Sequence, residues 1–507
     1  MFIRKKKNQS GSVSVQIIQK VSRKNKVIKS VGVAEDEREI EFLLDKARLE
    51  IPKLQTQGTF DFGHTRKDAG VLHSLRSAGS IKIRTVGPNL VLGNIFDSIG
   101  FNKIKEKLFK KLVIARITNP ASKLKTTEYW KNNNELDISS QTVYKFLDRL
   151  HKQYKTEIEQ ISYEYTKQIL KDITIVFYDM TTIYFEVREE DNLRKIGFSK
   201  DGKFQKPQIM LGLLVGENGY PIGYDIFKGN TFEGKTMLPI IKQLQNKYGF
   251  SNPIVVADSG LLSKNNIEQL KKENYKFILG ARIKNVSNEI KKEILKKSKE
   301  LKNGETILVK KDDDNLVISF SKNRAKKDKH NREKGLKKLK TKISSGKLTK
   351  EQINNRGYNK FLKIKNQIEV EIDESKIEID KKWDGLKGYL TNTNLSNDEV
   401  IKNYRNLWKI EKAFRISKSD LRIRPIFHYK KERIEAHICL SFVAYTIYKE
   451  LERLLKINKN DLSVTQAIEL LDTIYEITIT LPESGKEESI FADLSEAQLE
   501  LLRVTQV

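Results

Sequence analysis

The sequence predicts a mixed α/β fold, in which a sheet flanked by helices is interrupted by an inserted domain and preceded by an αβ and helical region. Residues 173–228 read as strands in series, separated by turn signals at Asp201-Gly202 and Asn218-Gly219. Helix and strand patterns then alternate as far as residue 281, which indicates a sheet with both antiparallel and parallel neighbours. A lysine-rich stretch breaks this pattern before long helices resume near residue 397.

Length and composition restrict the class of protein. A chain of 507 residues is too long for one hydrophobic core, so several structural units are expected. With 38% hydrophobic and 32% charged residues, the chain is neither fibrous nor wholly disordered. The single cysteine, Cys439, excludes an intramolecular disulfide framework and a multi-cysteine zinc site. No apolar run is long enough to span a bilayer, and we expect a soluble, cytoplasmic protein.

The positive charge of the chain is localised. Lys and Arg exceed Asp and Glu by 29 over the whole sequence. Residues 1–30 carry nine basic and no acidic side chains, and residues 322–350 have a net charge of +11, whereas residues 451–507 have a net charge of −6. A biased composition alone would not make one end acidic, so the distribution favours a nucleic-acid partner.

The N-terminal part is predicted to contain two units. Residues 1–85 form a small αβ unit, with strands at 12–19 and 26–34 and a helix at 35–50. Residues 86–168 are mostly helical, and Ser139 is expected to cap an amphipathic helix that begins at Ser140. Together with the helices before it, this segment fits a helix-turn-helix that binds DNA, although any helical bundle gives the same pattern.

The remainder is expected to form a divided core. Residues 169–285 supply its first part, 286–395 a basic insertion domain, 396–455 its second part, and 456–507 an acidic C-terminal helical region. In the first part we expect strands at 173–179, 183–187, 207–215, 221–227, 253–258 and 277–281, with helices at 235–245 and 263–273. In the second part, one helix is expected from about 397 through 418 and another over 431–455.

Two aspartates end apolar strand patterns. Asp179 shares a strand face with Ile173, Ile175 and Phe177, and Asp258 follows the apolar run 253–257. A buried carboxylate needs a cation, a donor or a metal ion, so the pair indicates a functional site. Either residue alone is equally well explained as a turn or helix cap.

A third carboxylate lies on an unusual helix face. If residues 397–418 form one helix, Tyr404, Trp408, Glu411, Arg415 and Lys418 fall within a sector of about 80°. Two aromatic rings and two cations beside an acid suit neither a core nor an ordinary solvent face. These side chains could instead stack on a nucleotide and bind phosphates. The alternative interpretation is an ordinary helix surface with ion pairs.

Four segments resemble bacterial insertion-sequence transposases of the DDE type, which have an RNase H-like catalytic core. They are FYDMTTIYFE (177–186), GYPIGYDIFKGNTFEGKT (219–236), VVADSGLLS (255–263) and LWKIEKAFRISKSDLRIRPIFH (407–428). The resemblance is to the group whose third motif is Tyr, two residues, Arg, three residues, Glu, six residues, Lys. Tyr404, Glu411 and Lys418 match this motif, whereas Leu407 stands at the family's Arg position.

The resemblance implies that the chain binds the ends of its own element, cuts phosphodiesters and joins the ends to target DNA. Asp179, Asp258 and Glu411 would be catalytic and hold Mg²⁺ or Mn²⁺, with two ions expected, because hard carboxylate oxygens suit such cations. Tyr404, Trp408, Arg415 and Lys418 would contact DNA, and Arg415 would replace the family Arg.

The expected partners are the terminal inverted repeats, target DNA and further copies of the chain, in a bacterial cytoplasm at the nucleoid and without a membrane. Two alternatives stay open. One is an RNase H-like endonuclease without strand transfer, and the other is a basic nucleic-acid-binding protein without catalysis.

Overall fold

The computed structural model describes residues 1–21, 24–54, 80–133, 136–261, 263–345, 354, 357–365, 369–480 and 485–505. The chain divides into two compact units. The first takes its residues from 1–86, 133–135 and 474–495, and the second from 87–132, 136–473 and 496–507. No helix in the described ranges is both long and apolar enough to cross a membrane.

The first unit contains two antiparallel three-stranded sheets. One has the order β1 (Phe2–Lys7), β2 (Val13–Val21), β3 (Lys24–Ala34), and α1 (Glu37–Leu54) packs on it through Ala47, against Val15 and Ile17. The sequence analysis missed β1 because its Lys residues hide the strand pattern, which is acceptable on an exposed edge strand. The other sheet has the order β16 (Glu487–Phe491), β15 (Tyr475–Thr480), β4 (Ser80–Thr85). The C-terminal region, expected to be helical, therefore also contains two strands.

The helical part of the second unit is built around one long helix, α15 (Lys431–Ile457), in agreement with the sequence analysis. The helices that contact it are α3 (Gly87–Ile99), α4 (Lys107–Thr118), α6 (Ser140–Arg149), α7 (Lys155–Leu170) and α16 (Val464–Leu471). Further short helices are α5 (Lys123–Asn132) and α17 (Glu496–Arg503). The expected N-cap is confirmed, because the Ser139 hydroxyl accepts a hydrogen bond from the Thr142 amide.

The catalytic sheet of the second unit has an RNase H-like core, as the resemblance implied. Its strands are β5 (Ile175–Tyr184), β6 (Gln208–Val215), β7 (Pro221–Lys228), β8 (Ile254–Ala257) and β9 (Lys276–Ala281), in the spatial order β7-β6-β5-β8-β9. The first three strands are antiparallel neighbours, and β5, β8 and β9 run parallel. The connecting helices α8 (Met237–Tyr248) and α9 (Lys264–Lys272) also agree with the sequence analysis.

One difference in this core affects the site. The sequence suggested separate strands at 173–179 and 183–187, whereas β5 continues without a break to Tyr184. Met180, Thr181 and Thr182 are buried and pair with β6, so no turn separates the two apolar runs. Asp179 therefore lies in the middle of a strand and not at its end.

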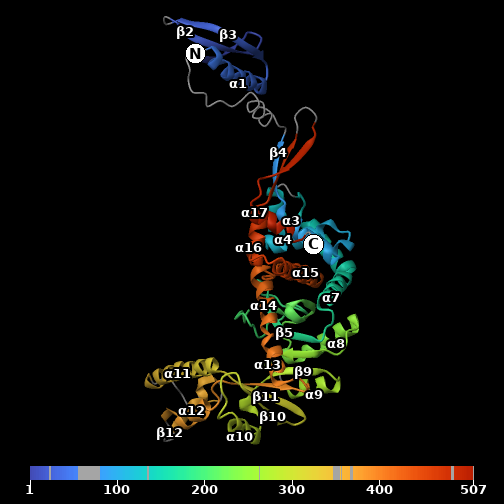
Figure 1. Cartoon of the computed structure of the whole chain (residues 1–507), viewed down its shortest axis with the longest axis vertical. Coiled ribbons are helices and arrows are strands. Elements are labelled where there is room, and N and C mark those ends of the chain that lie inside the picture. The colour runs from blue at the N-terminus through green and yellow to red at the C-terminus, as the bar shows by residue number, and fades with distance from the viewer. Residues whose placement is uncertain are drawn as a thin grey trace. The chain divides into compact units, whose positions relative to one another are not determined.

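The segment 286–395 divides into two structural parts. After α10 (Asn288–Lys297), the strands β10 (Thr306–Lys311), β11 (Asp314–Phe320) and β14 (Leu386–Thr391) extend the catalytic sheet beyond β9. The other part contains α11 (Lys322–Ser344), α12 (Glu374–Lys381) and the hairpin of β12 (Leu362–Lys365) and β13 (Glu369–Ile372). Its small core includes Leu339, Phe361 and Ile377, and Figure 1 shows α11, α12 and β12 grouped at the β10–β11 end of the sheet.

The helix expected over 397–418 is interrupted. α13 (Asn397–Arg405) ends before a turn at Asn406 and Leu407, and α14 (Trp408–Arg415) begins after it and continues into a wider turn over 416–420. Tyr404, before the interruption, is buried, whereas Glu411, after it, is exposed, so the two residues differ in their surroundings.

Candidate active site

Asp179 and Asp258 come from neighbouring parallel strands. In the register of β5 and β8, Tyr178 lies opposite Ala257, so Asp179 and Asp258 are the next residues along each strand. Burial raises the pKa of Asp179 to about 6, and the negative charge of Asp258 contributes to the same shift. The structure therefore brings these two sequence-predicted carboxylates together.

A lysine that the sequence analysis did not identify contacts Asp179 and a further carboxylate, that of Glu233. The Lys200 Nζ atom lies 3.5 Å from Asp179 Oδ1 and 2.6 Å from Glu233 Oε1, and it donates a hydrogen bond to the Met180 carbonyl oxygen at 2.6 Å. Although burial opposes the shift, the two carboxylates raise the pKa of Lys200. A cation is thus seated among oxygen atoms only, which is the donor set that a hard divalent metal ion requires.

Asp258 itself is exposed, and its Oδ1 accepts a hydrogen bond from the Gly260 amide at 2.7 Å. The carboxylate thus has the turn-capping role that was its alternative interpretation. A cap of this kind leaves the second carboxylate oxygen of Asp258 free to bind another group, so the two roles do not exclude each other.

Glu411 lies exposed on α14, at some distance from the other two acids. Burial raises the pKa of Tyr404 to about 12, with further contributions from the charges of Asp258 and Glu411, so this hydroxyl lies within the electrostatic field of both. In the described part of the chain, however, no three His, Cys, Asp or Glu side chains are grouped closely enough to hold a metal ion. The expected convergence of Asp179, Asp258 and Glu411 on metal ions therefore stays a prediction. Mutual repulsion between like charges and the position of Lys200 are consistent with the separation.

The four residues expected to contact DNA differ in their surroundings. Tyr404 is buried, with its ring centroid 4.8 Å from that of Tyr389. Trp408 is 54% exposed, and Arg415 is exposed without an ion pair to Glu411 within the described residues. The Lys418 Nζ atom donates hydrogen bonds to both carboxylate oxygens of Asp201, each at 3.2 Å. Only Trp408 and Arg415 are therefore directly available to a ligand.

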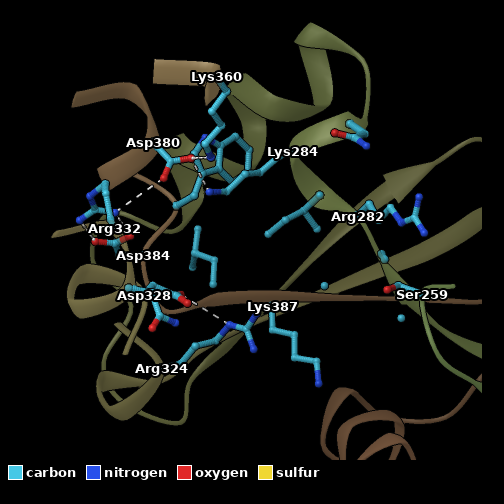
Figure 2. Close-up of a pocket in the computed structure, with 18 of the residues that line it drawn as sticks. Ser259, Arg282, Lys284, Arg324, Asp328, Arg332, Lys360, Asp380, Asp384 and Lys387 are labelled. Atoms are coloured by element: carbon cyan, nitrogen blue, oxygen red, sulfur yellow. Dashed lines mark hydrogen bonds and ion pairs between the residues drawn. The ribbon is translucent and has the colours of Figure 1, made fainter. Parts of the chain in front are cut away.

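A cavity of about 550 Å³ lies between the catalytic sheet and the inserted segment, next to Ser259 and Tyr404. Six Lys or Arg and three Asp residues line it, which are Arg282, Lys284, Arg324, Arg332, Lys360, Lys387, Asp328, Asp380 and Asp384. Figure 2 shows the ion pairs on one side of the cavity, where Arg332 contacts Asp384 through two hydrogen bonds of 2.6 Å. Lys284 and Lys360 both contact Asp380, at 2.7 and 2.8 Å.

Two cations on the other side of the cavity lack such partners. Within the described residues, neither Arg282 nor Lys387 has a carboxylate at ion-pair distance. Lys387 Nζ lies over the Tyr404 ring, 4.4 Å from its centroid, and burial lowers its pKa. The cavity therefore presents two cations that have no ion pair in the described part of the chain, near Ser259, the residue that follows Asp258. The lysine-rich pattern had pointed to α11 as cationic, but nothing in the sequence marked Arg282 or Lys387.

Comparison with known proteins identifies a protein family that matches this part of the chain. The family described as "Transposase DDE domain" matches residues 171–447. No curated protein matches the chain. Among solved structures, a piggyBac transposase synaptic complex with hairpin DNA matches this chain with 9% sequence identity and a TM-score of 0.39. The match covers 76% of this chain and 76% of the piggyBac chain. A Mos1 transposase paired-end complex with the left transposon end matches this chain with 15% sequence identity and a TM-score of 0.16. That match covers 33% of this chain and 57% of the Mos1 chain.

The two structural likenesses are weak, so the assignment depends on the matched domain, which spans more than half of the chain. With its RNase H-like strand order and its paired aspartates, the chain belongs to the family of transposases with a DDE domain, and it is a DNA transposase of the metal-dependent polynucleotidyl transferase class.

Proposed function

We propose that Asp179, Asp258 and Glu411 hold two divalent ions, Mg²⁺ or Mn²⁺, and that the site cuts the ends of the element and joins them to target DNA. The observation that carries the proposal is the pair of aspartates on neighbouring parallel strands, near a cavity lined by Arg282 and Lys387. When bound, such ions activate the attacking oxygen and stabilise the leaving oxygen of a phosphodiester.

The residues of the chain have distinct parts in this proposal. Arg282 and Lys387 bind phosphates of the DNA strand that enters the cavity, because no carboxylate neutralises them. Trp408 stacks on an exposed base and Arg415 contacts a phosphate, since both are accessible on the helix that carries Glu411. Tyr404 acts by positioning Lys387, whose ammonium group lies over its ring, because the ring itself is buried.

Lys418 is proposed to contact DNA only after it leaves Asp201. The same carboxylate also pairs with Arg424, so it keeps a partner when Lys418 moves. Lys418→Ala should consequently weaken binding to precleaved ends less than Arg415→Ala does. An equal or larger loss for Lys418→Ala would contradict the assignment of Arg415 as the primary contact.

The carboxylates are tested by incubating labelled element ends with each variant in Mg²⁺ or Mn²⁺ and mapping cut and joined products. We expect Asp179→Asn, Asp258→Asn and Glu411→Gln each to abolish cleavage while binding to the ends is retained. Asp313→Asn, in the exposed turn between β10 and β11, is a matched control that should cleave normally. Wild-type cleavage by any of the first three variants would remove that residue from the metal-binding set, and cutting without joining would identify an endonuclease.

Lys200 provides a second test of the metal site. Because its ammonium group already contacts Asp179 and Glu233, it competes with a divalent ion for the same oxygens. Lys200→Gln should therefore lower the Mg²⁺ concentration that gives half-maximal cleavage. An unchanged or higher concentration would mean that Lys200 does not oppose metal binding.

The working complex is proposed to contain several copies of the chain on the terminal inverted repeats, in a bacterial cytoplasm. Light scattering of the protein alone and with paired element ends should give a larger protein stoichiometry with DNA. A single copy on each pair of ends would contradict this part of the proposal.

A further inference from the structure

A second cavity, of about 260 Å³, lies where the α4–α5 connection meets the segment that precedes α15. Arg116, Lys123 and Lys125 line one side of it, and Arg422 and Arg424 line the other. No Asp or Glu contributes to its lining, which distinguishes it from the cavity beside Asp258. It therefore concentrates five cationic side chains around one space.

Two of these cations are buried without a counterion. Arg116 and Lys123 are each only 4% exposed. The Arg116 guanidinium donates hydrogen bonds to three backbone carbonyl groups, those of Leu421, Arg422 and Ala121, at 3.2 to 3.5 Å. Within the described residues, its Nε has no partner and Lys123 forms no ion pair. Burying a charge in this way is unfavourable unless another group compensates it.

The expected protonation behaviour of both cations agrees with the lack of a counterion among the residues that the structure describes. Burial lowers the pKa of Arg116 to about 10 and that of Lys123 well below its usual range, and the charge of Arg116 lowers the latter further. A carboxylate in contact would shift both values in the opposite direction. Of the acids near the cavity, Asp148 is held by Arg433 through hydrogen bonds of 2.7 and 2.8 Å, and Asp201 pairs with the lining residue Arg424.

Two buried histidines complete the wall. The ring centroids of His428 and His437 lie 5.6 Å apart, and both residues line the cavity. His437 Nε2 donates to the Ile423 carbonyl oxygen at 3.0 Å, which leaves its buried Nδ1 without a partner among the described residues. Because Nε2 donates, Nδ1 of the neutral ring is an acceptor, so the unpartnered group that an anion would satisfy is the Nε–H of Arg116.

We propose that this cavity binds a phosphate group of the DNA backbone, at a site separate from the carboxylates that cut DNA. A phosphodiester supplies the missing negative charge and accepts hydrogen bonds from Arg116 and Lys123. Phe427 lines the same cavity and is 58% exposed, which suits stacking on a base next to that phosphate. The choice of DNA as the source of the phosphate rests on the proposed function, whereas the anion site does not.

The anion site is tested on the full chain with inorganic phosphate as the probe. Because Lys123 is buried without a counterion, Lys123→Met should raise the Tm of the free protein by about 1 to 2 °C, opposite to the usual effect of core substitutions. Phosphate should raise the Tm of the wild type but not that of Lys123→Met. Lys131→Met, on the same helix but in an exposed pair with Asp137, is the matched control and should respond to phosphate as the wild type does.

The DNA source is tested by measuring affinity for element ends as a function of salt. Lys123→Met should weaken binding about tenfold and reduce the slope of log K against log salt by about 0.9, which corresponds to one lost phosphate contact. Lys125 lies at the exposed rim of the cavity, so Lys125→Gln should give a smaller loss of affinity with no change in Tm. This variant tests the cavity even if Lys123→Met fails to fold.

The outcomes separate the parts of the proposal. A Tm response to phosphate without any change in DNA affinity would overturn DNA as the source and leave a site for free phosphate. If phosphate stabilises Lys123→Met as much as the wild type, the anion site itself is refuted. Neither result depends on cleavage, so Asp179→Asn should bind phosphate normally even if the proposed catalytic function fails.

Discussion

Removing the Glu452 carboxylate should loosen the attachment of the catalytic helix α14 to α15. Lys412 on α14 lies 2.5 Å from Glu452 Oε1, and Lys449 on α15 contacts Oε2. The Glu452 side chain is 14% exposed and that of Lys449 only 8%, so both charges are substantially removed from water. Burial alone would raise the pKa of Glu452, but the two ammonium groups outweigh it and hold the pKa at about 2.

The size and sign of the effect follow from this shift. A carboxyl pKa lowered from 4.5 to about 2 corresponds to about 3 kcal/mol of stabilisation of the folded protein. Because the folded-state pKa is depressed, this contribution is fully present above about pH 4.5 and is lost as the pH falls toward 2. Glu452→Gln should therefore lower the free energy of unfolding by about 3 kcal/mol at pH 7, and the difference should shrink below pH 4.5.

Urea denaturation at pH 7, 5 and 3.5 measures this difference. Glu268→Gln is the control, because Glu268 is 63% exposed and lies 3.9 Å from Lys264, and such a pair contributes less than about 1 kcal/mol. Lys412 directly follows Glu411, so Glu452→Gln should also slow cleavage of element ends without changing their binding. A loss below about 0.5 kcal/mol at pH 7, or a loss independent of pH, would refute the reasoning.

Three further changes test other parts of the structure. Burial raises the pKa of Asp472 to about 6, so its ionisation destabilises the folded protein increasingly as the pH rises from 3.8 through 6. In thermal melts, Asp472→Asn should therefore stabilise the protein by about 1 to 3 kcal/mol at pH 7.5 and have little effect at pH 4. Arg332→Ala leaves the Asp384 carboxylate without its two hydrogen bonds and should cost about 3 kcal/mol in denaturant unfolding. Gly280→Ala places a Cβ atom 2.4 Å from the Tyr404 hydroxyl, so it should cost about 1 to 3 kcal/mol and slow cleavage, as measured by unfolding and product mapping.

Much of the catalytic sheet could be predicted from the sequence because its strands are mostly apolar and are separated by turn residues. Every residue of β6 is buried, and such a strand appears in the sequence as an uninterrupted apolar run. The strands β10, β11 and β14 follow short apolar runs in the sequence, but these runs do not indicate which strand each one pairs with. Strand pairing with β9 is a tertiary property, so the sequence placed them in a separate insertion domain although they extend the catalytic sheet.

The site could be predicted only where a polar residue breaks an apolar pattern. Asp179 and Asp258 stand out in this way, and the register of β5 and β8 brings them together. The chain contains 95 Lys and Arg residues. Residue type alone therefore does not distinguish Lys200, Arg282 and Lys387 from the other basic residues. Their importance comes from neighbours supplied by other strands and loops, which one sequence does not show.

The interruption between α13 and α14 explains why the aromatic and cationic helix face was only partly correct. Neither Asn406 nor Leu407 is a glycine or proline, and Leu407 keeps a right-handed helical backbone, so no local signal marks the break. The break turns Tyr404 toward the sheet, where it packs against Gly280, and leaves Glu411 exposed on the next helix. Leu407, at the family's Arg position, is itself buried, and an arginine there would place an uncompensated charge in the core. Burial lowers the pKa of Lys387 on β14, and this residue lies close enough for the charge of Glu411 to oppose that shift, so a strand of the inserted segment brings a cation toward this helix.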